Sequence, residues 1–190
     1  IEALNDGRGN LFAGKVDMNR IAIVGHSRGG QAAALAADFD RFFAADEYQS
    51  YRVNRNFNID VIIAVAPTDM LIYDRRLKVN NINYLLLQGS NDADVNTFSG
   101  DRHYNRIDYT DQTYRFKSSL YIKGANHGQF NTSWDRRDIG LPTQLFLNNK
   151  DLLDGEDQRT IAKVYVSAFL ERLFHDDKRY EPIFKDYRYA

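Results

Sequence analysis

A pentapeptide near the start of the chain holds the residues best suited to chemistry. Residues 25–29 read Gly-His-Ser-Arg-Gly, a G-x-S-x-G pattern centred on Ser27. An apolar run at 20–24 precedes it and an alanine-rich run at 30–37 follows it. A serine between a strand and a helix in this pattern is typical of a nucleophile elbow, a sharp turn that exposes the hydroxyl group. Because strand and helix nearly touch at such a turn, we expect a side chain at Gly25 or Gly29 to clash.

A serine hydroxyl is a poor nucleophile until a base removes its proton, and that base needs an acid to fix its tautomer. His127 follows an apolar run through a short glycine-containing loop, which favours it as the base. His26 lies inside the elbow, His103 in a polar stretch and His175 in a charged tail, and these places suit a base less well. A histidine base predicts a rate that rises with pH through its ordinary pKa of about 6.5.

The acid should follow a strand that lies between the elbow and the histidine in the chain. Asp92 comes directly after the apolar run 84–88, so we favour it as the acid. Asp94 in the same loop and Asp69 after an earlier apolar run remain alternatives.

The acidic loop also resembles the opening of a calcium-binding loop, since Asp92, Asp94 and Asn96 alternate. However, Thr97 stands where such a loop requires glycine, and His103 stands where it requires glutamate. The chain contains no cysteine, which excludes thiol catalysis, disulfides and thiolate metal sites. We therefore expect neither a metal site nor a cofactor.

Buried strands alternate with helical patterns along the chain, which predicts an α/β fold with a mostly parallel sheet flanked by helices. Strands are expected at 21–24, 61–66, 84–88 and 116–123. Helices are expected from Gly29 to about Phe43 and after Asp154, a suitable N-cap. Residues 44–58 are interpreted as a surface excursion, and residues 175–190 as a C-terminal surface tail.

The bulk composition predicts one globular domain over residues 1–190. Hydrophobic residues make up 43% of the 190 residues, and the formal net charge is −1. This charge balance gives no electrostatic case for a nucleic-acid partner. No apolar run approaches the roughly 18 residues that a membrane-spanning helix needs. The composition fits a secreted protein as well as a cytoplasmic one, so the localisation is left undetermined.

Three motifs, residues 25–30, 87–95 and 125–130, together resemble the α/β-hydrolase superfamily over roughly residues 15–175. The most similar branch holds bacterial esterases, including dienelactone-hydrolase-like, chlorophyllase-like and polyester-hydrolase-like enzymes. The resemblance implies a serine hydrolase that cleaves carboxylic esters through an acyl-enzyme, with Ser27 as nucleophile, Asp92 as acid and His127 as base. An amidase, peptidase or acyltransferase with the same triad, or a non-catalytic binding module, are the alternatives.

The resemblance also implies an oxyanion hole that uses the backbone N–H of Arg28, the residue after the nucleophile. The second donor normally comes from a loop after an early strand, and nothing before residue 20 resembles that loop. We therefore expect a partial hydrolase domain that lacks the N-terminal strands. Its elbow strand should have an unpaired edge or pair with another chain, through self-association or with a missing N-terminal part.

Aromatic residues near the expected site are candidates for the walls of a substrate pocket for a small or polymeric ester. They are His26, Tyr73, Phe130 and Trp134. The charged runs 75–76 and 135–138 are interpreted as solvated, mutually paired charges.

Overall fold

The computed structural model describes residues 1–7, 9–44, 56–134 and 136–186. Its centre is a four-stranded sheet in the order β1-β2-β3-β4, and every neighbouring pair is parallel. The strands are β1 (Ile21–His26), β2 (Ile59–Val65), β3 (Asn83–Gly89) and β4 (Lys117–Ile122). The predicted α/β arrangement with a parallel sheet is therefore confirmed.

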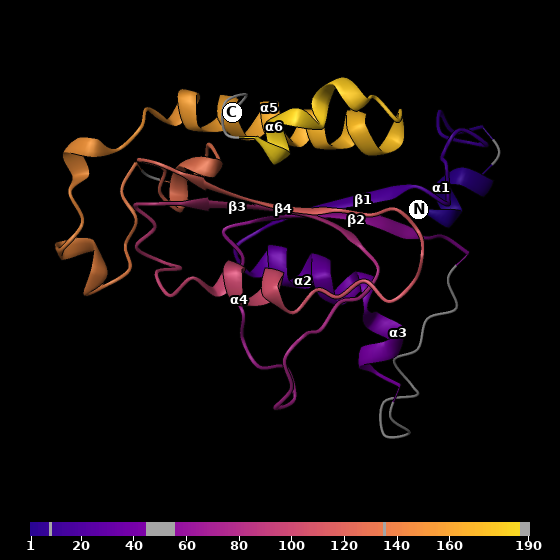
Figure 1. Ribbon diagram of the computed structural model, residues 1–190, viewed down its shortest axis with the longest axis horizontal. Helices are drawn as coiled ribbons and strands as arrows, with labels where there is room; N and C mark the ends of the chain where they lie inside the picture. The colour runs from indigo at the N-terminus through magenta and orange to yellow at the C-terminus, as the bar shows by residue number, and fades with distance from the viewer. Residues whose placement is uncertain (8, 45–55, 135, 187–190) are drawn as a thin grey trace.

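Helices cover both faces of the sheet (Figure 1). On one face lie α2 (Arg28–Ala37), α3 (Phe39–Phe42) and α4 (Ser99–Asn105), and on the other lie α5 (Gly155–Phe174) and α6 (Pro182–Lys185). The remaining short elements are α1 (Glu2–Asp6), η2 (Gly128–Phe130), η3 (Thr143–Leu145), η4 (Asn149–Asp151) and η5 (Lys178–Tyr180). Both middle strands are buried on both sides, which explains their almost continuous apolar sequence.

The two faces of the sheet support separate hydrophobic clusters. Alternate residues of β2, such as Ile62 and Ala64, pack toward α2 and α3, whereas Val61 and Ile63 pack toward Phe169 of α5. The long α5 begins as predicted, because the Asp154 side chain accepts the N–H of Glu156 at 2.8 Å.

The helix predicted from Gly29 to about Phe43 is instead two helices. α2 ends at Ala37, and Asp38 interrupts the run with φ −102° and ψ 9°. The Asp38 carboxylate binds the Arg41 guanidinium at 2.6 Å, which gives the break a local partner. Most of the predicted surface excursion, residues 45–55, lies outside the described residues.

The elbow strand lies at the edge of the sheet. Among the described strands, β1 pairs with β2 alone, and Val24 on β1 is 56% exposed. The predicted unpaired edge of this strand is therefore confirmed.

The C-terminal tail is more than a surface covering. Within it, Phe184 of α6 packs against Phe116, Tyr165 and Phe169. Its ring thereby completes the hydrophobic cluster between α5 and the sheet. Residues 187–190 lie outside the described part of the chain.

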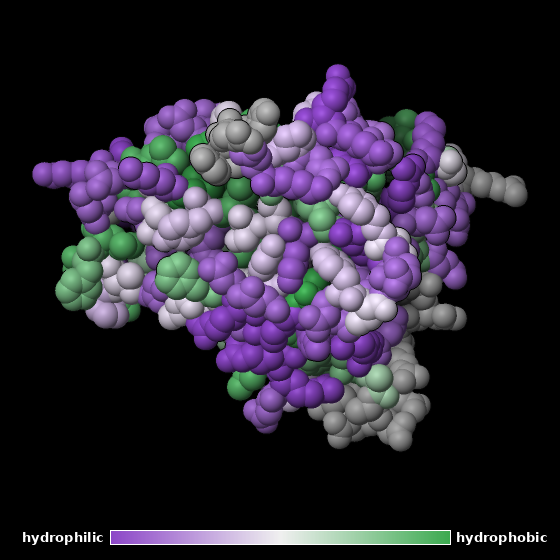
Figure 2. All heavy atoms as spheres, viewed as in Figure 1, coloured by the Kyte–Doolittle hydropathy of each residue, from purple (hydrophilic) through white to green (hydrophobic). Residues whose placement is uncertain are grey.

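The surface carries no broad apolar area on the face seen in Figure 2, where hydrophilic residues predominate and hydrophobic ones form small groups. One group at the left end coincides with residues 139–146, whose exposed side chains are Ile139, Leu141, Leu145 and Phe146. Within the described ranges, every helix is too short or too polar to cross a bilayer.

Candidate active site

The turn between β1 and α2 has the geometry of a nucleophile elbow. Ser27 adopts φ 58° and ψ −124°, a backbone conformation that non-glycine residues rarely take. Its N–H donates to the carbonyl of Val65 at 2.9 Å, and its carbonyl accepts the N–H of Gly30 at 3.0 Å. These bonds hold the strained residue between the end of β2 and the start of α2.

The requirement for glycine is confirmed at Gly25 and wrong at Gly29. A Cβ at Gly25 would overlap the backbone of Gly29, whereas a Cβ at Gly29 would meet nothing within 4 Å. The second close approach is instead at Gly30, where an added Cβ would lie 2.9 Å from the Cβ of Pro67. The helix therefore crosses the loop after β2 one residue later than the pattern indicates.

His127 and Asp92 form a buried hydrogen-bonded pair at the ends of β4 and β3. Nδ1 of His127 lies 2.8 Å from Oδ2 of Asp92, and both side chains are 2% exposed. The other carboxylate oxygen, Oδ1, accepts the N–H groups of Asp94 at 3.0 Å and Val95 at 2.6 Å. Asp92 thus has a fixed orientation, with hydrogen-bond partners on both carboxylate oxygens.

The alternative acids have other positions. Asp69 is buried in ion pairs with Arg106 and with Arg76, at 3.0 Å for the latter. The loop after β2 is therefore tied to the C-cap of α4 through Arg106. Arg76 pairs with buried Asp69, which lies outside the charged runs 75–76 and 135–138. Asp94 is exposed and lines a cavity beside the pair.

Ser27 is not hydrogen-bonded to His127 in the described part of the structure. The His127 ring instead has aromatic neighbours: the His26 ring centroid lies 4.6 Å away, and the Trp134 centroid lies 5.7 Å away in a stacked arrangement. His26 also contacts Trp134 and Phe130, with ring centroids at 5.1 and 6.0 Å. Three of the four predicted pocket aromatics therefore lie together: His26 and Trp134 pack against His127, and Phe130 packs against His26.

Tyr73 is the exception among these aromatics. Its ring packs edge-on to Phe43, 6.1 Å between centroids, and Phe43 belongs to the cluster under α2 and α3. Its backbone and that of Asp74 have positive φ angles of 46° and 57°, in a tight turn closed by Ile72 and Arg75. This turn places Tyr73 against the cluster under α2 and α3, and no ring contact joins it to His127 in the described part of the chain.

The two histidines have opposite pKa shifts. Burial alone lowers the pKa of His127, but its hydrogen bond to Asp92 and the charges of Asp92, Asp138 and Asp94 outweigh burial, so the net pKa is raised. Burial and the neighbouring His127 lower the pKa of His26 to about 4. His26 is therefore neutral at pH 7, whereas His127 is prepared to accept a proton.

The acid and histidine loops are joined through their backbones. Asn91 N–H donates to the carbonyl of Ala125 at 2.8 Å, and the Ser90 hydroxyl accepts the N–H of Gly124 at 2.8 Å. Gly89 permits this approach, because a Cβ there would overlap the Ala125 carbonyl.

Two buried polar side chains that sequence reasoning missed complete this framework. Gln158 of α5 accepts the Asn126 N–H at 3.1 Å and donates to its carbonyl at 2.9 Å. Asp138 accepts backbone N–H groups from both loops, and it is 6% exposed. The interpretation of residues 135–138 as solvated charges is therefore wrong for Asp138. It is consistent with Arg136 and Arg137, which are exposed. Asp135 lies outside the described residues.

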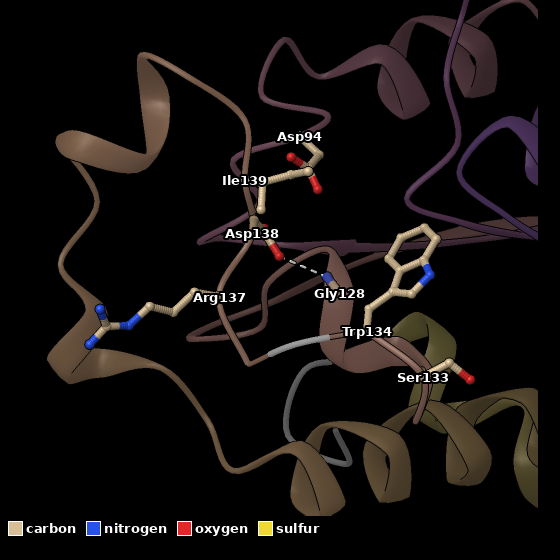
Figure 3. Close-up of a pocket in the computed structure, with 7 residues that line it drawn as sticks. All are labelled: Asp94, Gly128, Ser133, Trp134, Arg137, Asp138 and Ile139. Carbon is tan, nitrogen blue, oxygen red and sulfur yellow. Dashed lines mark hydrogen bonds between the residues drawn. The ribbon is translucent and has the colours of Figure 1, made fainter.

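A cavity of about 380 Å³ lies beside His127. It is lined by Asp94, Gly128, Ser133, Trp134, Arg137, Asp138 and Ile139 (Figure 3). In that view the Asp138 carboxylate points at the Gly128 N–H, while the Arg137 side chain points in the other direction. A second cavity of about 280 Å³, between β1 and α5, includes His26 and Phe130.

The N–H of Arg28, the first residue of α2, has no hydrogen-bond acceptor among residues that the structure describes. It therefore remains available to an anionic group at the helix N-terminus, where the helix dipole favours negative charge. Within the described ranges, no three or more His, Asp or Glu side chains are grouped so that they could hold a metal ion.

Comparison with known protein families and with curated proteins finds no match to this chain. The function must therefore be inferred from the residues and their geometry.

Proposed function

We propose that this protein is a serine hydrolase of the α/β-hydrolase type that cleaves carboxylic esters. The observation that carries the proposal is the combination of a strained serine at the turn after β1 with a buried His127–Asp92 pair at the ends of β4 and β3. The three residues occur in the order serine, acid, histidine, each after a parallel strand, as that superfamily requires.

The reaction begins when Ser27 Oγ attacks the ester carbonyl carbon and its proton passes to Nε2 of His127. The Asp92 carboxylate accepts the Nδ1–H, which leaves Nε2 free as the base. The carbonyl oxygen becomes an oxyanion that accepts the Arg28 N–H. When the tetrahedral intermediate collapses, the alkoxide takes the proton from Nε2, and an acyl-enzyme remains. Water then attacks the acyl carbon by the same steps and releases the acid and free Ser27.

The absence of a Ser27–His127 hydrogen bond is compatible with this mechanism. Catalytic hydrogen bonds are often long or poorly aligned without substrate, and they shorten in the complex. We expect the bond to form when a substrate occupies the cavity that Trp134 lines beside His127.

The alternative of a non-catalytic binding module is less well supported. Backbone strain of the kind at Ser27 costs about 1–3 kcal/mol and persists where function requires it. A binding module has no requirement for a strained serine together with an oriented histidine. An amidase, peptidase or acyltransferase would use the same residues, and a panel of acyl substrates distinguishes these activities.

The test is covalent labelling with a fluorophosphonate, combined with hydrolysis of short acyl esters of p-nitrophenol. The wild-type chain should be labelled once, at Ser27, and Ser27→Ala should abolish both labelling and turnover. Ser167→Ala is the matched control, because Ser167 is an exposed serine on α5 that does not line the cavity beside His127. Unlabelled wild-type protein, or label on a serine other than Ser27, would contradict the proposal.

A further inference from the structure

A buried carboxylate that belongs to neither loop connects the loop of Asp92 with the loop of His127. Oδ2 of Asp138 accepts the N–H groups of Ala93 and His127, both at 2.9 Å, and Oδ1 accepts that of Gly128 at 2.8 Å. Ala93 is the residue after Asp92, so Asp138 holds the backbone immediately beside the acid and at the base itself. Hydrogen bonds to an ionised acceptor are about twice as strong as those between neutral groups.

The segment that carries Asp138 is fitted closely to both loops. Asn126 of the histidine loop donates its side-chain amide to the carbonyl of Arg136 at 2.7 Å. On the other side of Asp138, Gly140 lies against the acid loop so closely that a Cβ there would overlap the Ala93 carbonyl. The carboxylate is thus placed by contacts on either side of it in the chain.

The hydrogen-bond pattern favours the ionised form of Asp138, because all three of its partners are donors and a carboxylate offers only acceptor oxygens. Burial and the nearby charge of Asp92 raise its pKa, while the three N–H groups oppose that increase. Burial of a carboxylate costs free energy unless hydrogen bonds compensate for the lost water, and the three N–H groups provide that compensation for Asp138.

We propose that Asp138 is a positioning residue that fixes the acid loop against the histidine loop and places a second negative charge beside His127. The Nδ1 atom of His127 is bonded to Asp92 and the three partners of Asp138 are backbone N–H groups, so Asp138 does not replace Asp92 as the acid. It acts through the backbone that carries Asp92 and His127, and through its charge.

The titratable groups that act on His127 come from several elements. Asp92 and Asp94 belong to the loop after β3, Asp138 to the segment after η2, and His26 to the end of β1. The three carboxylates raise the pKa of His127. The positive charge of protonated His127 in turn lowers the pKa of His26. Removal of the Asp138 charge should therefore lower the pKa of His127 while the Asp92 hydrogen bond remains.

The test is an NMR titration of the His127 imidazole in the wild-type chain and in Asp138→Asn. The asparagine keeps the shape of the side chain, retains an acceptor oxygen and loses the charge. We expect the His127 midpoint to fall below that of wild type. We also expect the amide hydrogens of Ala93, His127 and Gly128 to exchange with solvent about tenfold faster or more.

Asp60→Asn is the matched control, because Asp60 is a half-buried carboxylate on β2 that acts on neither loop. It should change neither the His127 titration nor the three exchange rates. An unchanged His127 midpoint and unchanged exchange in a folded Asp138→Asn variant would overturn the proposal. Asp138→Ala is a second variant, which removes both carboxylate oxygens. If that variant fails to fold, Asp138→Asn alone still decides the proposal.

The rate consequence rests on the proposed function. If the chain is an esterase, Asp138→Asn should lower kcat about tenfold or more, leave KM nearly unchanged, and shift the pH–rate midpoint downward with the NMR midpoint. A wild-type chain without esterase activity would contradict the proposed function, whereas the titration and exchange arms would still test Asp138. The two failures are therefore distinguishable.

Discussion

The two halves of the candidate site differ in how completely the surrounding structure holds them. On the side of β3 and β4, Asp92 and His127 are buried and bonded to each other, and Asp138 joins their loops. Gln158 of α5 binds the histidine loop at Asn126. On the side of β1, Ser27 lies at the end of an edge strand, and its hydroxyl bonds neither to the imidazole nor to any other described group.

This difference separates two kinds of preorganisation. The Asp92–His127 pair is fixed by many polar contacts among loops that are far apart in the chain. Ser27, the proposed nucleophile, is fixed by local backbone geometry, through Gly25, its own strained backbone and one bond to Val65. Substitutions should therefore affect the two halves in different ways.

The largest effect is expected from Ser27→Ala. Loss of the nucleophile should lower kcat for a p-nitrophenyl ester by about 10⁶-fold, as removal of a triad serine does elsewhere. Thermal unfolding should change little, since alanine meets the same backbone strain and the serine hydroxyl makes no described bond. Calorimetry and ester hydrolysis measure the two quantities, and near-wild-type turnover would refute the role of Ser27.

The next largest effect compares the two aspartates that follow strands. Asp92→Asn should lower kcat about 10⁴-fold with the fold intact, because an amide no longer fixes the required tautomer of His127. Asp69→Asn should leave kcat within tenfold of wild type but cost about 3–5 kcal/mol of stability, because it leaves Arg106 and Arg76 without their buried partner. Urea unfolding and steady-state kinetics on both variants check this, and the reverse pattern would identify Asp69 as the acid.

A smaller effect separates the two glycines of the elbow. Gly25→Ala should destabilise the chain by about 3 kcal/mol or more, since its methyl group would overlap the backbone of Gly29. Gly29→Ala should be neutral or slightly stabilising, because nothing lies within 4 Å and alanine favours a helix. Equal unfolding midpoints for the two variants would show that the strand and helix do not touch at Gly25.

The smallest effect concerns pH. Only neutral His127 can act as a base, so the rate should increase as pH rises through its pKa. Because that pKa is raised above 6.5, the midpoint should lie above the value expected from the sequence alone. A pH–rate profile of kcat/KM checks this, and a midpoint below 6.5 would mean that burial outweighs the three carboxylates.

The sequence predicted the parts of the molecule that depend on local pattern. Strands β2 and β3 were recognisable because burial on both faces makes them continuously apolar. Ser27, Asp92 and His127 were selected by residue type and by their places after successive strands. Their catalytic roles stay predictions, but the Asp92–His127 hydrogen bond that those roles require is present.

The remaining features depend on contacts between distant segments, which a local pattern does not reveal. Asp138 belongs to a charged run that resembles a solvated surface, and it is buried only because its segment returns to the loop of Asp92. The close approach at Gly30 depends on where α2 crosses Pro67. Arg106, the C-cap residue of α4, reaches Asp69 from 37 positions away in the chain.

At position 27, the observed backbone angles and the side chain that the proposed reaction needs call for different residues. Glycine adopts φ 58° and ψ −124° as readily as the mirror-image extended conformation, whereas serine pays for it with about 1–3 kcal/mol. That cost is a substantial share of the 5–15 kcal/mol by which a typical domain is stable. The most stable version of this chain would therefore carry glycine there and lack its hydroxyl group, so selection for stability alone would remove the proposed nucleophile.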